Sequence, residues 1–266
     1  MKAILIGVGA DSNNSKILSP VFPKEDNEFV FLPIGDNTDG VVIKENTKIF
    51  GKKIINFLGR EYIGEHLHID PYFDEENKMY TYGDRTHNEK MKPIPTKQKL
   101  LELKPGNYLF FCNRMYEMDR EDYRIPKYNE IKKKQGGKLK HLYLFGYFKI
   151  KRIDTINSET PSDERERIAG LHSKNAHIIR KDHDCSNGYL PKNHPKRKLI
   201  LILGDENESI LLKKAIKLTT CRDGRHYLEQ RWFPYFESDN FGSSIGLCKW
   251  INNSEKFLNE LSNEIF

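Results

Sequence analysis

Residues 101–116, "LELKPGNYLFFCNRMY", decide the fold. A short apolar segment is stopped by Pro105 and Gly106, and a second apolar segment begins at Tyr108. Proline and glycine end helices and favour turns, so this stretch predicts a short helix, a turn and a strand. The strand runs directly into the polar residues at 112–116, whose groups could hold a flat, polar ligand.

Further strands are expected where short runs rich in β-branched and aromatic residues lie between Gly, Pro, Asn and Asp. With the first strand included, these runs cover residues 3–8, 29–33, 108–112, 142–150 and 199–203. Two longer helices are expected after Ser209 and Ser254, because each serine can cap a segment with apolar residues at helical spacing.

The elements occur in a mixed order rather than as alternating strands and helices, which predicts an α+β fold. We expect a partly barrel-like mixed sheet with flanking helices. No segment has the composition of a linker, so residues 1–266 are interpreted as one domain. The polar stretch "NSETPSDERERIAG" at 157–170 is interpreted as an exposed loop.

The composition indicates a globular protein with a charged surface. Hydrophobic residues make up 37% and charged residues 31% of the 266. No stretch approaches the roughly 20 apolar residues of a membrane span, and the opening run has no signal-peptide cleavage region. The four cysteines are far apart and form no Cys-x-x-Cys pair, which argues against a zinc knuckle or a disulfide framework. We therefore expect a cytoplasmic protein that is not associated with a membrane.

The net charge of +6 permits a phosphate-rich partner without requiring one. Lysine and arginine concentrate in "KYNEIKKKQGGKLKH" at 127–141 and in "LPKNHPKRK" at 190–198. Such runs are usually solvated loops, but either could contact a nucleic-acid backbone.

A short helix, "LKPGNYLFF" at 103–111 and the later glycine-bearing strand "YLFGYFKIKRI" at 143–153 resemble the core of PUA-like barrels, the group that holds the EVE, ASCH and YTH domains. The resemblance places a PUA-like core at about residues 96–210. It implies a cleft between barrel strands that receives a nucleobase, often a modified or extruded one.

A wider resemblance covers nearly the whole chain. The segments that carry it, in order, are "GADS" at 9–12, "HIDPYF" at 68–73, "YTYGD" at 80–84, "LKPGNYLFF" at 103–111, "YLFGYF" at 143–148, "NAHIIR" at 175–180, "LILGDENESILLKKAIKL" at 201–218 and "SSIGLCKWI" at 243–251. They resemble the nucleotide modification associated domain of the third type, a group associated with DNA base hypermodification. That resemblance implies a role in base modification but no particular reaction. The insertion at 117–137 departs from the pattern and leaves substrate preference open.

The stretch "HLHID" places His66, His68 and Asp70 at alternate positions, which share one face of an extended chain. Imidazole and carboxylate donors suit zinc or iron. Pro71 ends any strand at once and no fourth ligand is marked, so we predict no metal and no other cofactor. His68 and Asp70 are expected to line a pocket, and together with Asp11 they are the candidates for acid or base catalysis.

Another set of side chains could bind a base or a nucleic-acid backbone by stacking, by hydrogen bonds or by charge. Its members are Tyr82, Asp84, Asn113, Arg114, Tyr116, Asn175 and His177.

Three functions stay open. The first is binding of a modified or extruded base in the PUA-like cleft, as part of a DNA modification or restriction system. The second is a nucleobase- or nucleotide-modifying enzyme that uses His68 and Asp70. The third is a metal-dependent nuclease, for which Asp84 and Glu102-Leu103-Lys104 have the D…E-x-K spacing. The expected partner is a nucleic acid, DNA in the first place, or a nucleotide; no oligomeric state is predicted.

Overall fold

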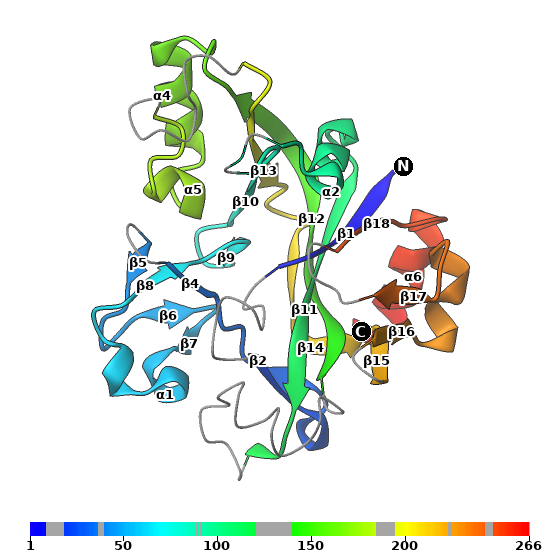
Figure 1. Ribbon diagram of the computed structural model, residues 1–266. Helices are drawn as coiled ribbons and strands as arrows, with labels where there is room; N and C mark the ends of the chain where they lie inside the picture. Colours follow the sequence, from blue (N-terminus) through cyan, green and yellow to red (C-terminus); the bar gives the residue numbers. More distant parts are fainter. Residues whose placement is uncertain are drawn as a thin grey trace.

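The computed structural model describes residues 1–8, 19–36, 40–88, 90, 92–120, 140–184, 195–222, 225–242 and 247–265. The fold is α+β, as predicted, with a curled, half-barrel sheet and a few helices. The long strands β11 (Tyr108–Glu117) and β12 (Lys140–Ile156) run through its centre (Figure 1).

The main sheet contains strands from both halves of the chain. It has the order β18-β1-β11-β12-β13-β10-β9, with β14 paired to β12, and β2 paired to β11 and β3. The further bounds are β18 (Cys248–Trp250), β1 (Ala3–Gly7), β13 (Leu199–Gly204), β10 (Met79–Arg85), β9 (Tyr72–Asp74), β14 (Ile210–Lys217), β2 (Ser19–Phe22) and β3 (Glu28–Phe29). Both β13 and β14 pair antiparallel with successive parts of β12.

The centre of this sheet is buried on both faces, which explains why its strands are continuously apolar. In β11, Leu109 and Phe111 belong to one hydrophobic cluster, whereas Phe110 and Cys112 belong to the other. Successive strand residues point to opposite faces, so each cluster takes every second residue.

Smaller units flank the sheet on two sides (Figure 1). On one side lie β4 (Ile34–Asp36), β5 (Val41–Val42), β6 (Lys48–Ile49), β7 (Lys52–Lys53), α1 (Ile55–Leu58) and β8 (His66–His68), with the 3-10 turn η2 (Arg60–Tyr62) between α1 and β8. On the other lie β15 (Thr219–Arg222), β16 (Arg225–Leu228), η6 (Gln230–Tyr235), β17 (Asn240–Gly242) and α6 (Ser254–Ile265). The second expected helix is thereby confirmed, but it begins at Ser254, whose hydroxyl donates to the carbonyl oxygen of Met1 and does not cap the helix.

Two helices pack near one end of the sheet. α4 (Ser162–Leu171) carries buried Ile168 and Ala169, which cluster with Leu199 and Leu201 of β13. α5 (Ala176–Ile179) follows and contacts β10. Among the residues described, no helix combines the length and apolar character needed to cross a membrane.

The predicted helix, turn and strand at 101–116 are present. The helical part consists of α2 (Pro95–Gln98) and η3 (Lys99–Glu102), and a turn at Gly106, with a φ of 83°, leads into β11. The turn, β11, β12 and β13 fall within the 96–210 segment where a PUA-like core is expected, and that identity stays a prediction.

Three predictions are wrong. The segment after Ser209 is the strand β14, because its apolar Leu212, Ala215 and Ile216 are buried while it pairs with β12. The segment 29–33 is a strand only at its first residue, as the end of β3, and the buried residues after it bond instead to residues such as Pro20 and Ser19. The expected loop at 157–170 contains most of α4, whose apolar residues cover β13.

Candidate functional site

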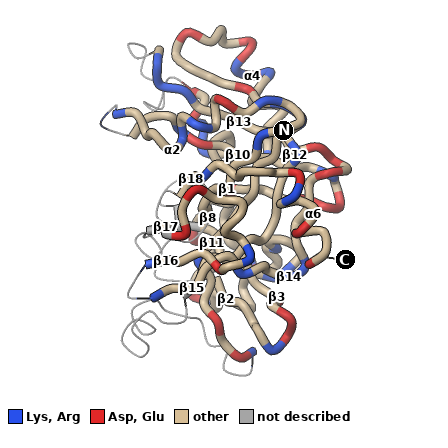
Figure 2. The backbone as a smooth tube through the Cα atoms, turned by 90° about the vertical axis from the view of Figure 1, so that its right-hand side faces the viewer, with Lys and Arg blue, Asp and Glu red and all other residues tan. Residues whose placement is uncertain are grey.

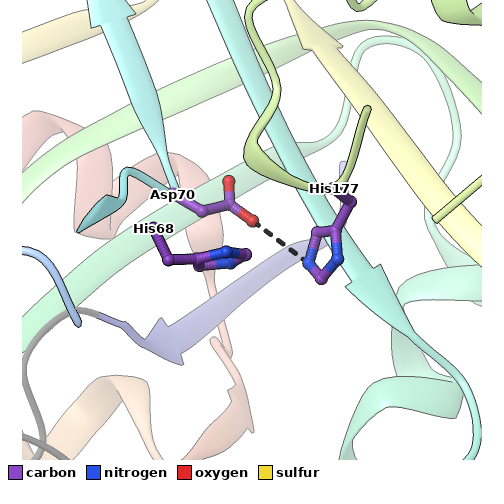
Figure 3. A group of neighbouring side chains, drawn as sticks. All are labelled: His68, Asp70 and His177. Carbon is purple, nitrogen blue, oxygen red and sulfur yellow. Dashed lines mark ion pairs between the residues drawn. The ribbon is translucent and has the colours of Figure 1, made fainter. Parts of the chain in front are cut away.

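His68, Asp70 and His177 come together although Asp70 and His177 are 107 positions apart in the sequence (Figure 3). His68 is the last residue of β8, Asp70 lies between β8 and β9, and His177 belongs to α5. One nitrogen or oxygen atom of each lies within 4.8 Å of those of the other two. In the described part of the chain this is the one group of three His, Cys, Asp or Glu donors so arranged.

Asp70 is held by the neighbouring strand. Its side chain is buried, and its two carboxylate oxygens lie 3.2 and 3.1 Å from the backbone N–H of Gly83 in β10, which donates to them. Burial, and secondly the nearby carboxylate of Asp84, raise the pKa of Asp70 well above its ordinary value.

His177 reaches this position because β10 lacks a side chain at Gly83. A Cβ atom there would lie 2.6 Å from Oδ1 of Asn175 and 2.9 Å from Cδ2 of His177. Asn175 caps α5, since its side chain accepts a 3.0 Å hydrogen bond from the backbone N–H of His177. The glycine therefore lets the start of α5 pack directly on the strand.

The ring of His177 is oriented by Asp182. Nδ1 of the ring lies 2.6 Å from Oδ2 of Asp182, and Nε2 lies 3.7 Å from Oδ2 of Asp70. Asp182 is itself held by ion pairs with Arg85 at 2.7 Å and Arg180 at 3.0 Å. Asp182, held by Arg85 and Arg180, thus fixes which ring nitrogen of His177 faces the cluster.

His68 completes the group, whereas His66 turns elsewhere. The rings of His68 and His177 meet edge to face, with centroids 4.8 Å apart and planes at 80°. Nδ1 of His66 lies 3.3 Å from the carbonyl oxygen of Gly40. The donor set that the structure assembles therefore differs from the His66, His68 and Asp70 set considered from sequence.

Tyr82 and Asp84 form a second polar group on β10. The Tyr82 hydroxyl donates a 2.5 Å hydrogen bond to Asp84, which also makes an ion pair with Lys97. Burial and then the Asp84 charge raise the pKa of Tyr82 well above its ordinary value. Glu102, the other acid of the nuclease alternative, pairs with a different lysine, Lys2, at 3.9 Å.

The base-binding candidates on β11, Asn113, Arg114 and Tyr116, lie in the second half of the strand, away from the Pro-Gly turn. Asn113 is buried, and its amide donates a 2.8 Å hydrogen bond to the hydroxyl of Ser19. Tyr116 is also buried, and Arg114 is half-buried. None of the three belongs to the group formed by His68, Asp70 and His177. Asp11 and most of the lysine-rich run at 127–141 lie outside the described residues.

Sequence reasoning missed Gly83, Asp182 and a second buried histidine–carboxylate pair. Nε2 of His172 lies 3.1 Å from Asp154, and Nδ1 lies 3.0 Å from the hydroxyl of Thr81. Bonds from His172 and Arg152 hold the pKa of Asp154 at about 2, although burial alone would raise it. Nothing in the sequence marks Asp182 as a partner of His177, from which it stands five positions away.

A cavity of about 340 Å³ lies elsewhere in the fold. It contains none of the predicted site residues; its lining includes Phe29, Phe31, Phe50 and Lys52.

Positive and negative residues are interspersed along the described backbone in the view of Figure 2.

The comparisons with known proteins identify the family. Nothing among curated proteins and nothing among solved structures matches the chain. Residues 2–256 match the family model described as nucleotide modification associated domain 3, which confirms the resemblance found in the sequence. The chain therefore belongs to the nucleotide modification associated domain 3 family, and this membership implies a role in nucleotide or DNA modification systems.

Proposed function

We propose that the protein is an enzyme that acts on a nucleobase or nucleotide, with His68, Asp70 and His177 at its reacting centre. The observation that carries the proposal is the convergence of these three side chains, from β8, the β8–β9 connection and α5, within 4.8 Å. A carboxylate and two imidazoles can take up, release or hold a proton, and they can bind a cation.

The surrounding contacts support a constellation built for chemistry rather than for packing alone. Gly83 N–H fixes the Asp70 carboxylate, and Asp182 fixes the His177 ring. A reacting group held by a second partner keeps one geometry, which is the arrangement expected of a positioned acid or base. His68 is half-buried, so the cluster is not sealed from solvent on every side.

The alternative is a protein that only binds a modified or extruded base in a PUA-like cleft. Its proposed contacts include Asn113, Arg114 and Tyr116 on β11. The Asn113 amide already donates to Ser19. The enzyme is therefore the better-supported function, and binding without turnover is the outcome that would favour the alternative.

The test compares nucleosides from cells that express the full chain together with the genes beside it. Digested DNA and the free nucleotide pool are analysed by mass spectrometry. We expect a modified nucleoside with the unchanged protein, and its loss in His177→Ala and Asp70→Asn. His66→Ala is the matched control, since His66 lies two residues from His68 yet outside the cluster.

Two results would overturn the proposal. One is an unchanged yield of product from folded His177→Ala protein. The other is selective binding of a modified oligonucleotide by the purified protein with no product in any sample. Circular dichroism of each variant separates loss of chemistry from loss of fold.

A further inference from the structure

We infer that His68, Asp70 and His177 bind one divalent transition-metal ion. Two imidazoles and one carboxylate are the donors of many zinc and non-haem iron sites. The inference concerns the same cluster as the proposed function, but it does not depend on nucleobases being the substrate.

The distances between the three donors suit one ion if the side chains move slightly closer together. Zinc lies about 2.0–2.2 Å from nitrogen and oxygen ligands, so donors around one ion stand about 3–3.5 Å apart. Nε2 of His177 and Oδ2 of Asp70 are 3.7 Å apart, and all three donors fall within 4.8 Å. Shifts of about 1 Å in the side chains would complete the set.

The outer contacts are those that metal sites use. Ligand histidines commonly donate their second N–H to a carboxylate, which fixes the tautomer and the ring orientation. Asp182 stands in that position, 2.6 Å from Nδ1 of His177, and leaves Nε2 facing Asp70. In Figure 3 the Asp70 carboxylate points toward the ring of His177, with the His68 ring beside it.

The second buried histidine provides the contrast. His172 also lies beside a carboxylate, but its two nitrogens lie within hydrogen-bond distance of Asp154 and of the Thr81 hydroxyl. Both ring nitrogens are thus engaged in the interior, as expected of a structural histidine. His177 differs because its second nitrogen faces two further metal-type donors.

The types of the three donors limit which metal ions suit the site. Two of the three are nitrogens, which disfavours Mg²⁺ and Ca²⁺ because these ions prefer oxygen ligands. None of the three is a thiolate, so the set suits Zn²⁺, Fe²⁺, Co²⁺ or Mn²⁺. Three protein ligands leave at least one position for water or substrate, where an ion can polarise a bound group or lower the pKa of water.

Metal binding is tested directly on the purified full chain after treatment with a chelator. Titration calorimetry with Zn²⁺ is expected to give one equivalent bound, and Co²⁺ is expected to give visible absorption bands of a nitrogen- and oxygen-ligated ion. We expect about 100-fold weaker binding, or more, in His177→Ala and His68→Ala. His66→Ala should bind as the unchanged protein does.

The inference is overturned if the folded, unchanged protein binds neither ion, or if one equivalent binds equally well to His68→Ala, Asp70→Asn and His177→Ala. Where a variant fails to fold, histidine modification by diethyl pyrocarbonate replaces it: bound Zn²⁺ should protect two histidines of the unchanged protein. Metal binding without any modified nucleoside would refute the proposed function alone. A modified nucleoside that is lost in His177→Ala, together with no Zn²⁺ or Co²⁺ binding by the purified protein, would refute the metal site alone.

Discussion

The carboxylate of Asp182 lies 2.6 Å from Nδ1 of His177, and this contact sets the direction of the other ring nitrogen. Asp182 is therefore a positioning residue. We predict that Asp182→Ala lowers Zn²⁺ affinity about 10- to 100-fold, because the ring loses its fixed orientation. Calorimetry measures the affinity, and the Co²⁺ spectrum reports the geometry of the ligands.

Asp182→Asn is the conservative control. Its amide oxygen can still accept from the Nδ1–H of His177, so we expect it to restore part of the affinity and the Co²⁺ spectrum. Asp182 also pairs with Arg85 and Arg180, so both variants should lose stability. Equal Zn²⁺ affinity in the alanine variant and the unchanged protein would contradict a positioning role.

Gly83→Ala is predicted to disturb the cluster although it replaces none of the three donor side chains. The added methyl group would stand 2.6 Å from the Asn175 amide and 2.9 Å from the His177 ring, so α5 must move away from β10. Overpacking of this kind costs about 1–3 kcal/mol. We expect that loss in the free energy of unfolding in urea, together with weaker Zn²⁺ binding.

Gly170→Ala is the matched control for that substitution. Gly170 lies in α4, and an added Cβ would have nothing within 4 Å. Alanine favours a helix over glycine by up to about 1 kcal/mol, so this variant should be equally or more stable and bind Zn²⁺ normally. If both variants behave alike, the close approach at Gly83 does not matter for the site.

The sequence predicts the central sheet well because its strands are buried on both faces and are bounded by clear turns. It fails at β14, since Leu212, Ala215 and Ile216 fit a helical spacing, and only pairing with β12 makes the segment a strand. The residues "ILLKKAIK" alone do not indicate that the segment pairs with β12. Non-local pairing therefore overrides local pattern here.

The candidate site likewise depends on contacts between distant segments that the local sequence does not predict. His68, Asp70 and His177 are recognisable from sequence as polar candidates, but their convergence depends on α5 packing against Gly83, which is a contact between distant segments. Sequence spacing instead suggests His66 as a partner, because alternation holds within one strand and says nothing about other strands. Asp182 becomes visible only once the ring of His177 is placed.

Phe145 is predicted to contribute strongly to the stability of the hydrophobic core. Its side chain is fully buried, and its ring lies 5.0 Å from that of Phe31 and 6.3 Å from that of Phe73. Phe145→Ala should lower the free energy of unfolding by about 3–5 kcal/mol, through lost burial and the cavity it leaves. Phe233, 46% exposed, is the control, and its alanine variant should change stability by less than about 0.5 kcal/mol.

His141 should make the fold sensitive to mild acid. Burial, and secondly the Lys217 charge, lower its pKa from 6.5 to about 4, and its Nδ1 accepts a 2.9 Å bond from the backbone N–H of Cys221. The unfolded chain binds the proton first, so stability is full above pH 6.5 and is lost as pH falls toward 4. Urea unfolding across this window should show a loss of about 1–3 kcal/mol from this residue. His141→Asn keeps an acceptor for Cys221 but cannot titrate, so its curve should be flatter by that amount; parallel curves for the two proteins would refute the assignment.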